Sequence, residues 1–295
     1  MTTSASRTSL CLSKAAAIAA AFFCLPVAAQ TDEETLARGE YLLHAGGCIS
    51  CHVGDEPGDV ALAGGHALES PFGVFYSPNI TPDKETGIGS WSDDDFVNAF
   101  WEGENPDGDH YFPAFPYTSY TGMSRDDLLA LKAYLFSLEP VRRENREHDL
   151  WPIMSSRFAA GAWKFRYFDA ERFSPDPGQS DEWNRGAYLV RHVGHCGECH
   201  TPRNSFGALD MDLELTGNPE LSEDGGAPNI SGDPDNGIGS WRASDVDYFL
   251  EIGMLPDGDF TGGSMGPVIE DNTSHLTRED RQAIATYLQS VPGAE

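Results

Sequence analysis

The chain has 295 residues, which is enough for two domains of ordinary size. Acidic side chains number 47 against 19 basic ones, giving a formal net charge of −28. Nucleic acid and anionic membrane surfaces are poor partners for such a chain, because they carry charge of the same sign. A basic or mixed face on a partner protein is favoured, although the acidity would equally serve solubility in a salty habitat.

The first 29 residues predict an export signal that is removed from the mature protein. A polar start precedes an apolar run at positions 15–27, which is too short to span a bilayer, and Val27-Ala28-Ala29 supplies the small residues that a signal peptidase needs. Phe23 before Cys24 departs from the pattern of a lipid-anchored protein, and no later segment predicts a membrane span. We therefore expect a free protein in the periplasm or an equivalent exported compartment.

Four cysteines follow this signal, and all of them lie in two CxxCH sequences, residues 48–52 and 196–200. Two thiols three positions apart can each add to a vinyl group on one edge of a porphyrin, and the adjacent histidine is then held beneath the iron. The sequence therefore predicts two covalently bound haem c groups. Their predicted attachment points are Cys48, Cys51, Cys196 and Cys199, and their predicted proximal iron ligands are His52 and His200.

Three other interpretations of these cysteines fit less well. A redox dithiol would not need the trailing histidine, nor occur twice without alternating strands and helices around it. A four-thiolate zinc site would leave both histidines unused, and a disulfide across three residues is strained. Export, duplication of the motif and the use of every remaining thiol favour haem.

Internal repeats divide the mature chain into two units. Pro78-Asn79-Ile80 recurs at 228–230 and Gly87-Ile88-Gly89-Ser90-Trp91 at 237–241, both at an offset of 150 residues, and the haem motifs are 148 apart. We expect two tandem cytochrome c domains, residues 30–140 and 183–295.

Each unit is predicted to be helical at both ends and irregular between them. A helix should lead into each CxxCH sequence, and in the first unit Ser92 with Asp95 predicts the cap of a short helix with Phe96, Ala99 and Phe100 on its apolar face. No segment shows convincing strand alternation, so the predicted class is mainly α.

The last helix of each unit should begin at a capping box. Ser124 with Asp127 and Thr277 with Asp280 fit this pattern, with Asp in the usual Glu position. Apolar residues at helical spacing follow each box.

Residues 141–182 form a connector that begins with charged side chains and continues with aromatic ones. These aromatic residues are too many to be left in water, so we expect a helix with an arm that packs across both domains. They are Trp151, Phe158, Trp163, Phe165, Tyr167 and Phe168.

The distal ligand of each iron is expected to be a methionine sulfur, which is typical of electron-transfer cytochromes. Met265, in a loop of small residues before the last helix, is the candidate for the second haem, whereas Met254 fits packing better. The repeat places Phe115 opposite Met265, and phenylalanine cannot bind iron. Met123 is therefore the preferred distal ligand of the first haem, with His110 or an open position as the alternatives.

Other residues near the motifs have two interpretations each. Trp91 and Trp241 could donate to haem propionates or pack in the core, and Arg203 could pair with a propionate or be an ordinary surface arginine. An acidic segment at 233–237 suggests calcium but fits a turn better. Four histidines near the motifs are expected to be structural or surface groups: His44, His66, His192 and His195.

Together the two CxxCH units, the repeated Gly-Ile-Gly-Ser-Trp segment, Cys199-His200-Thr201-Pro202-Arg203-Asn204 and the Met265 loop resemble the multihaem cytochrome c subunits of membrane-bound alcohol and gluconate dehydrogenases. The resemblance covers nearly the whole mature chain. It implies a relay that takes electrons from a flavin or quinone-cofactor dehydrogenase and passes them to ubiquinone or a terminal oxidase.

This chain departs from that family in two respects. Those subunits usually carry three haems and a membrane-attaching tail, whereas this chain ends soon after its second unit, which disfavours direct reaction with membrane quinone. They also tend to have methionine where Phe115 stands. Two-haem relatives with phenylalanine there commonly keep a methionine at the position of Met123, so the resemblance supports that choice.

Three function classes follow from the two motifs. An electron carrier or cytochrome subunit, which passes electrons to a small cytochrome or an oxidase, needs both irons six-coordinate. A di-haem enzyme such as a peroxidase needs an open first haem, and a haem-based sensor needs a vacant position and usually a fused output domain. The sequence favours the carrier, with the peroxidase-like enzyme as the alternative.

Overall fold

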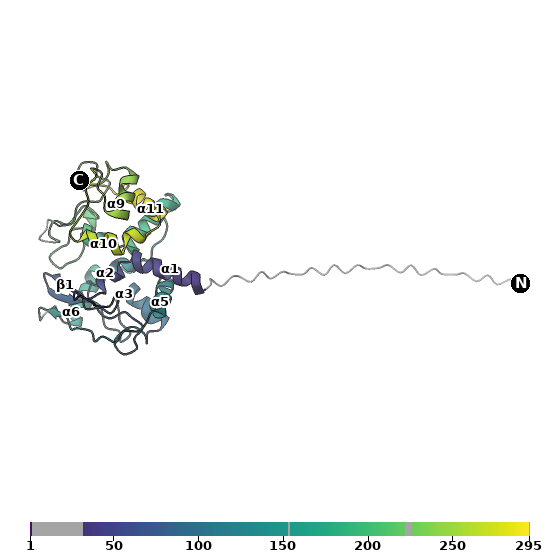
Figure 1. Ribbon diagram of the computed structural model, residues 1–295, viewed down its shortest axis with the longest axis vertical. Helices are drawn as coiled ribbons and strands as arrows, with labels where there is room; N and C mark the ends of the chain where they lie inside the picture. Colours follow the sequence, from purple (N-terminus) through teal and green to yellow (C-terminus); the bar gives the residue numbers. More distant parts are fainter. Residues whose placement is uncertain (2–31, 153, 222–225, 295) are drawn as a thin grey trace.

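The computed structural model describes residues 1, 32–152, 154–221 and 226–294. The predicted export signal thus lies, apart from Met1, outside the described residues. The described chain is mainly helical, as predicted, and adds one small sheet (Figure 1). No helix in these ranges is long and apolar enough to cross a membrane.

Two helices frame the first half of the chain. α1 (Asp32–Ala45) packs against α5 (Arg125–Ser137), whose Leu128, Leu131 and Leu135 are buried at helical spacing. The helices cross at Gly39, where a Cβ atom would lie 2.1 Å from the carbonyl oxygen of Ala130. Only glycine permits this backbone approach.

The second half repeats the arrangement. α7 (Asp181–Tyr188) continues into the π-helix η1 (Leu189–Val193) and packs against α11 (Arg278–Leu288). The crossing point is Gly186, where a Cβ atom would lie 2.0 Å from the carbonyl oxygen of Ala283. In Figure 1, α1 runs across the middle of the molecule, between the part that carries α3, α5 and α6 and the part that carries α9 and α11.

In each half, shorter helices lie in sequence between the two members of the helix pair. The first half contains α2 (Cys48–Cys51), α3 (Asp93–Glu102) and α4 (Tyr117–Tyr120). The second half contains α8 (Gly197–His200), the 3-10 turn η2 (Met211–Leu213), α9 (Ala243–Ile252), α10 (Met265–Asp271) and the 3-10 turn η3 (Thr273–His275).

The predicted cap of α3 is confirmed. The backbone N–H of Asp95 donates to Ser92 Oγ at 3.1 Å, and the backbone N–H of Ser92 donates to the Asp95 carboxylate at 2.8 Å. At α5 and α11 only the hydroxyl half of the box forms, from Ser124 and Thr277. The two carboxylates that should complete these boxes instead bond to neighbouring helices.

The sheet was not predicted. β1 (Ala67–Ser70) and β2 (Gly73–Tyr76) form a hairpin, and β3 (Asp149–Leu150) adds an antiparallel edge in the order β1-β2-β3. Strands of four and two residues are too short to show alternation, and β3 comes from a distant part of the sequence. The hairpin turn is closed by Ser70 Oγ, which donates to the carbonyl oxygen of Gly73 at 2.7 Å.

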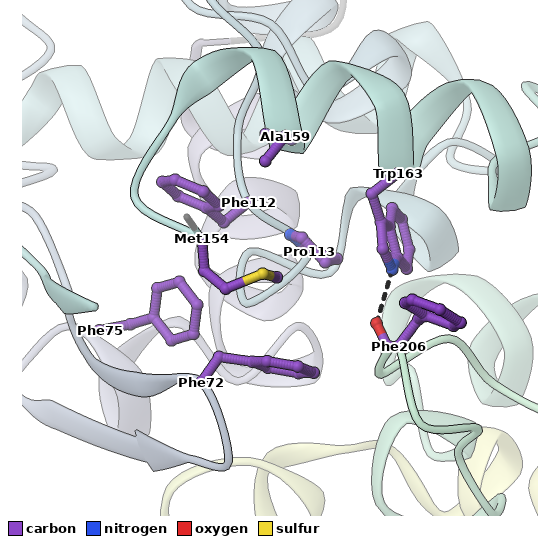
Figure 2. A pocket seen from close by; sticks show the side chains of 9 residues that line it. Phe72, Phe75, Phe112, Pro113, Met154, Ala159, Trp163 and Phe206 are labelled. Carbon is purple, nitrogen blue, oxygen red and sulfur yellow. Dashed lines mark hydrogen bonds between the residues drawn. The ribbon is translucent and has the colours of Figure 1, made fainter. Parts of the chain in front are cut away.

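A helix does occupy the connector, α6 (Arg157–Tyr167), and it contacts both halves. Lys164 forms an ion pair with Glu104 at 2.7 Å, and Trp163 Nε1 donates to the carbonyl oxygen of Phe206 at 2.8 Å. Figure 2 shows Trp163 beside a small apolar cavity between this helix and the β1–β2 hairpin, where Phe72 and Phe112 also lie.

The expectation that all the aromatic side chains of the connector are buried is wrong for three of them. Trp151 is 67% exposed, Phe158 85% and Phe165 93%. Because α6 lies at the surface, only the face that carries Trp163 packs inward. Aromatic content alone therefore overstated the burial of this segment.

The two halves are joined by reciprocal tyrosine–aspartate hydrogen bonds. Tyr188 Oη of α7 donates to Asp127 Oδ2 of α5 at 2.6 Å, and Tyr41 of α1 donates to Asp280 of α11. Each carboxylate also accepts from an arginine of its own half. Arg38 Nε donates to Asp127 at 2.6 Å and Arg185 Nε donates to Asp280 at 2.8 Å. Each buried carboxylate thus holds a helix pair together and ties that pair to the other half.

We predict that Gly39→Ala or Gly186→Ala lowers the free energy of unfolding by about 1–3 kcal/mol or more, because the added methyl group forces the crossing helices apart. The measurement is denaturant unfolding of the haem-loaded protein. Gly266→Ala is the control, since a Cβ atom at this helical position meets nothing within 4 Å. Equal effects at all three positions would contradict the crossing argument.

Tyr188→Phe should lower the free energy of unfolding by about 1–3 kcal/mol, because it removes a donor from a carboxylate whose side chain is only 3% exposed. Tyr134→Phe is the control, as its hydroxyl makes a comparable 3.1 Å bond to Glu40 at the surface and should cost under about 0.5 kcal/mol. A loss of stability no greater than that of the control would show that the bond does not join the halves.

Candidate functional site

Each CxxCH sequence forms a single helical turn that presents its two thiols together. α2 places Cys48 and Cys51 one turn apart, and the backbone N–H of His52 donates to the carbonyl oxygen of Cys48 at 2.9 Å. α8 repeats this, with the N–H of His200 donating to the carbonyl oxygen of Cys196 at 3.0 Å. All four of these cysteines are free thiols.

The thiols lie in apolar surroundings that keep them protonated. Burial raises the pKa of Cys48 to about 12 and that of Cys196 to about 12 as well. A reactive redox cysteine has a lowered pKa, stabilised by nearby positive charge or a helix N-terminus. The burial of these thiols therefore argues against the redox-dithiol interpretation.

The histidine of each motif is oriented by a proline carbonyl. His52 Nδ1 lies 2.8 Å from the carbonyl oxygen of Pro78, and His200 Nδ1 lies 2.7 Å from that of Pro228. A carbonyl can only accept, so Nδ1 carries the proton in each ring and Nε2 presents its lone pair. Burial lowers the pKa of both histidines, which favours the neutral form that binds a metal.

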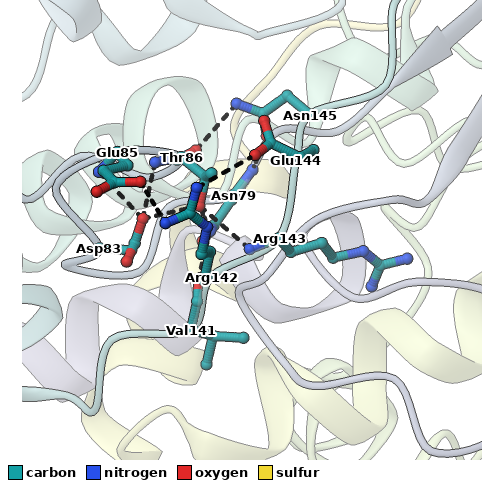
Figure 3. Close-up of polar contacts among 9 residues, drawn as sticks. All are labelled: Asn79, Asp83, Glu85, Thr86, Val141, Arg142, Arg143, Glu144 and Asn145. Carbon is teal, nitrogen blue, oxygen red and sulfur yellow. Dashed lines mark hydrogen bonds and ion pairs between the residues drawn. The ribbon is translucent and has the colours of Figure 1, made fainter.

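A polar network fixes the loop that carries Pro78 (Figure 3). Asn79 Nδ2 donates to Thr86 Oγ1 at 3.1 Å and to the carbonyl oxygen of Val141 at 2.7 Å, and the backbone N–H of Asn79 donates to Asn145 Oδ1 at 2.7 Å. The charged start of the connector thus packs on the loop that orients His52.

The two motifs lie against each other at the centre of the molecule. A Cβ atom at Gly46 would lie 3.8 Å from the carbonyl oxygen of Val193, and one at Gly194 would lie 3.7 Å from that of Ala45. Beyond its burial, the nearness of Cys199 also raises the pKa of Cys51. The two predicted attachment sites are therefore neighbours in space although 148 residues apart in sequence.

The methionines proposed as distal ligands occupy different settings. Met123 is 2% exposed and directly precedes Ser124, the cap of α5, and its carbonyl oxygen accepts from Trp101 Nε1 at 2.8 Å. Met265 is partly buried and begins α10. Met254 forms an isolated bridge with Phe260.

His110, the alternative ligand of the first haem, is directed toward the connector. Its Nδ1 lies 3.3 Å from the Glu104 carboxylate, and its ring packs against Gly161 of α6. The contact with Glu104 is not a hydrogen bond, and His110 Nδ1 is buried without a hydrogen-bond partner among the described residues.

Arg203 forms an ion pair with a residue of the second motif. Its guanidinium contacts the Glu198 carboxylate at 2.5 Å and donates to the carbonyl oxygen of Gly207 at 2.7 Å. Trp91 and Trp241 pack against the core.

The sequence did not indicate several polar groups at the junction of the motifs. Glu198 accepts from Thr118 and Ser119 of the first half, and Tyr120 Oη donates to the carbonyl oxygen of Gly46 at 2.7 Å. Tyr41 and Tyr188 do occupy the same place in the repeated Arg-Gly-x-Tyr-Leu segment. That repetition was the one sequence signal that could have predicted equivalent roles for these two tyrosines.

The donor set fits covalently bound haem. Each motif offers two reduced thiols on one turn and an imidazole with Nε2 unused, which are the groups that haem c attachment requires. Within the described residues, Tyr117 Oη is also buried without a hydrogen-bond partner. A further polar group or a water would satisfy it.

Comparison with known proteins gives relatives that include several named cytochrome c proteins. A protein described as "Diheme cytochrome c-type", from Cereibacter sphaeroides, is 42% identical over 261 residues, which cover 88% of this chain and 86% of that protein. The gluconate 2-dehydrogenase cytochrome c subunit of Pantoea cypripedii is 38% identical over 274 residues, 89% of this chain and 60% of that one. The cytochrome c subunit of a quinone alcohol dehydrogenase from Gluconacetobacter polyoxogenes is 36% identical over 270 residues, 88% of this chain and 57% of the subunit.

The chain therefore spans most of the first relative but less than two thirds of the two dehydrogenase subunits. The predicted resemblance to cytochrome c subunits of alcohol and gluconate dehydrogenases is confirmed by these matches. No protein-family model matches the chain.

Proposed function

The chain belongs to the family of diheme cytochromes c and dehydrogenase cytochrome c subunits, and we propose that it is a di-haem cytochrome that relays electrons from a dehydrogenase to a downstream cytochrome or terminal oxidase. The observation that carries this proposal is the pair of CxxCH turns packed against each other, each with its histidine bonded to a proline carbonyl. Two redox groups held this way would be close enough to exchange electrons.

In this proposal, Cys48 and Cys51 hold the first haem and Cys196 and Cys199 the second. His52 and His200 are the proximal ligands. When bound, each haem supplies an iron that alternates between the ferrous and ferric states. The protein's own residues hold each imidazole in one tautomer, with Nε2 free to bind the iron.

Two tandem cytochrome c domains, residues 30–140 and 183–295, with a connector at 141–182, account for the repeated geometry. The support is the matching helix crossings at Gly39 and Gly186 and the matching histidine–proline bonds. We propose that the connector fixes the angle between the domains through the bonds that α6 makes to both halves.

Met265 is proposed as the distal ligand of the second haem and Met123 as that of the first. Burial of Met123 supports a role inside the fold, because a thioether must leave water to reach an iron. Six-coordinate irons suit electron transfer and disfavour substrate chemistry.

The proposed setting is the periplasm or an equivalent exported compartment, where haem is attached to CxxCH sequences. The proposed partners are a dehydrogenase subunit, which donates electrons, and a small cytochrome or an oxidase, which accepts them. An acidic surface would speed transient docking to a basic or mixed face of such proteins. Neither nucleic acid nor a membrane span has a part in this proposal.

Expression in a host that attaches haem should yield a coloured protein with two porphyrins that survive denaturation, because thioether bonds are covalent. Mass spectrometry of the denatured protein measures their number. The double variant Cys48→Ser/Cys51→Ser should retain one porphyrin, and Cys196→Ser/Cys199→Ser the other. A colourless product with four titratable thiols would exclude the proposed function.

Met123→Ala and Met265→Ala should each convert one iron to a high-spin form and remove about half of the near-infrared band that arises from sulfur bound to ferric iron. Visible and near-infrared absorption provides the measurement, with Met254→Ala as the control that should change nothing. A wild-type protein in which one iron is already high-spin and reacts with peroxide would favour the peroxidase-like alternative. A change with His110→Ala and none with Met123→Ala would reassign the first ligand.

A further inference from the structure

The two haem motifs meet the opposite half of the molecule in matching ways. Ser119 of α4, which precedes the last helix of the first half, contacts the second motif at Glu198. Asn272, which precedes the last helix of the second half, lies against the first motif, with its Nδ2 3.1 Å from the position of a Cβ atom on Gly47. The contact surfaces are thus related by the repeat.

One position breaks this match. The residue just before the second cysteine is Glu198 in the second motif and Ser50 in the first. Ser50 Oγ donates to the carbonyl oxygen of Gly47, within its own motif, at 3.0 Å. The second motif therefore carries a negative charge where the first carries a neutral hydroxyl.

Glu198 is built into this junction. Its side chain is 11% exposed, its carboxylate accepts from Thr118 Oγ1 at 3.0 Å and Ser119 Oγ at 3.1 Å, and Arg203 contacts it at 2.5 Å. Exclusion from water keeps its field from being screened.

The field of Glu198 acts on the attachment site beside it. Glu198 directly precedes Cys199 in the sequence, so its carboxylate lies next to the attachment point, and the paired guanidinium of Arg203 offsets only part of its charge. A negative charge stabilises a positive neighbour, and a ferric haem carries one more positive charge than a ferrous one. A haem attached at Cys199 would therefore be stabilised in its oxidised state.

We propose that Glu198 is a positioning residue that lowers the reduction potential of the second haem, so that an electron shared by the pair rests preferentially on the first haem. This inference depends on the proposed di-haem function. The hydroxyl donors from α4 hold the charge in place, so the first half of the molecule helps to set the potential of the second.

The test is redox titration of the purified di-haem protein, followed through its visible haem bands. Glu198→Gln removes the charge but keeps the shape, and it should raise one of the two midpoint potentials. We expect the equilibrium between the haems to change by about tenfold, which is about 59 mV for one electron. Glu198→Asp keeps the charge and should restore most of the wild-type difference.

Ser50→Glu provides the reciprocal test, because it places a carboxylate at the matching position of the first motif. It should lower the midpoint potential that Glu198→Gln leaves unchanged. Asp94→Asn controls for net charge, since Asp94 is 78% exposed and pairs with Arg125 at the surface. It should leave both potentials unchanged.

Unchanged potentials in Glu198→Gln, or an equal shift of both, would overturn the inference, because the charge would then not distinguish the haems. If Glu198→Gln fails to fold, Ser50→Glu carries the same test, and an unchanged or raised potential in that variant overturns the inference as well. Absence of haem bands from the wild-type protein would instead refute the proposed function, so the two failures remain distinct.

Discussion

Two buried carboxylates, those of Asp127 and Asp280, connect the helix pairs to each other. Each accepts from an arginine of its own half and from a tyrosine of the other half. A buried carboxylate without donors costs several kcal/mol, so these bonds are coupled to the packing around them. The helix crossing within each half and the contact between the halves consequently depend on the same two groups.

The carboxyl of Asp280 resists acid more than an ordinary carboxyl does. Burial by itself raises the pKa of Asp280, but its bonds to Arg185 and Tyr41 outweigh that effect and hold the pKa below its ordinary value of 3.8. A carboxyl with a lowered pKa contributes stability at any pH above its ordinary pKa, and that stability is lost as the pH falls through the lower, folded value. The bonds that Asp280 makes between the halves are therefore insensitive to pH in the neutral range.

Local signals in the sequence predicted the local features. The box at Ser92 and Asp95 and the apolar spacing of the helix that follows depend on residues within two turns, and the structure has them as predicted. The boxes at Ser124 and Thr277 formed only in part, because Asp127 and Asp280 found stronger partners on other helices. A capping rule considers only residues near in sequence, so it cannot predict a donor from another helix.

Features that depend on distant residues were missed for the same reason. β3 pairs with β2 although the two are far apart in sequence, and neither strand is long enough to show a period of two. The exposure of Phe158 and Phe165 depends on which face of α6 meets the hairpin, which composition does not record. At the site, the haem motifs could be identified from the CxxCH spacing alone. The pairing of Glu198 with Thr118 and Ser119 could not be predicted, because it depends on how distant parts of the chain fold together.

The chain after each final helix closes the loop that supports a histidine. After α5, the carbonyl oxygen of Val141 accepts from Asn79, beside Pro78. After α11, the carbonyl oxygen of Val291 accepts from the N–H of Gly232 at 2.8 Å, a few residues beyond Pro228. Because Pro78 and Pro228 orient the two imidazoles, each final helix is coupled through its following residues to the proximal side of its own motif. The charged start of the connector therefore acts as part of the first half. The two accepting carbonyl groups belong to valines 150 residues apart, so the repeat extends to this supporting contact.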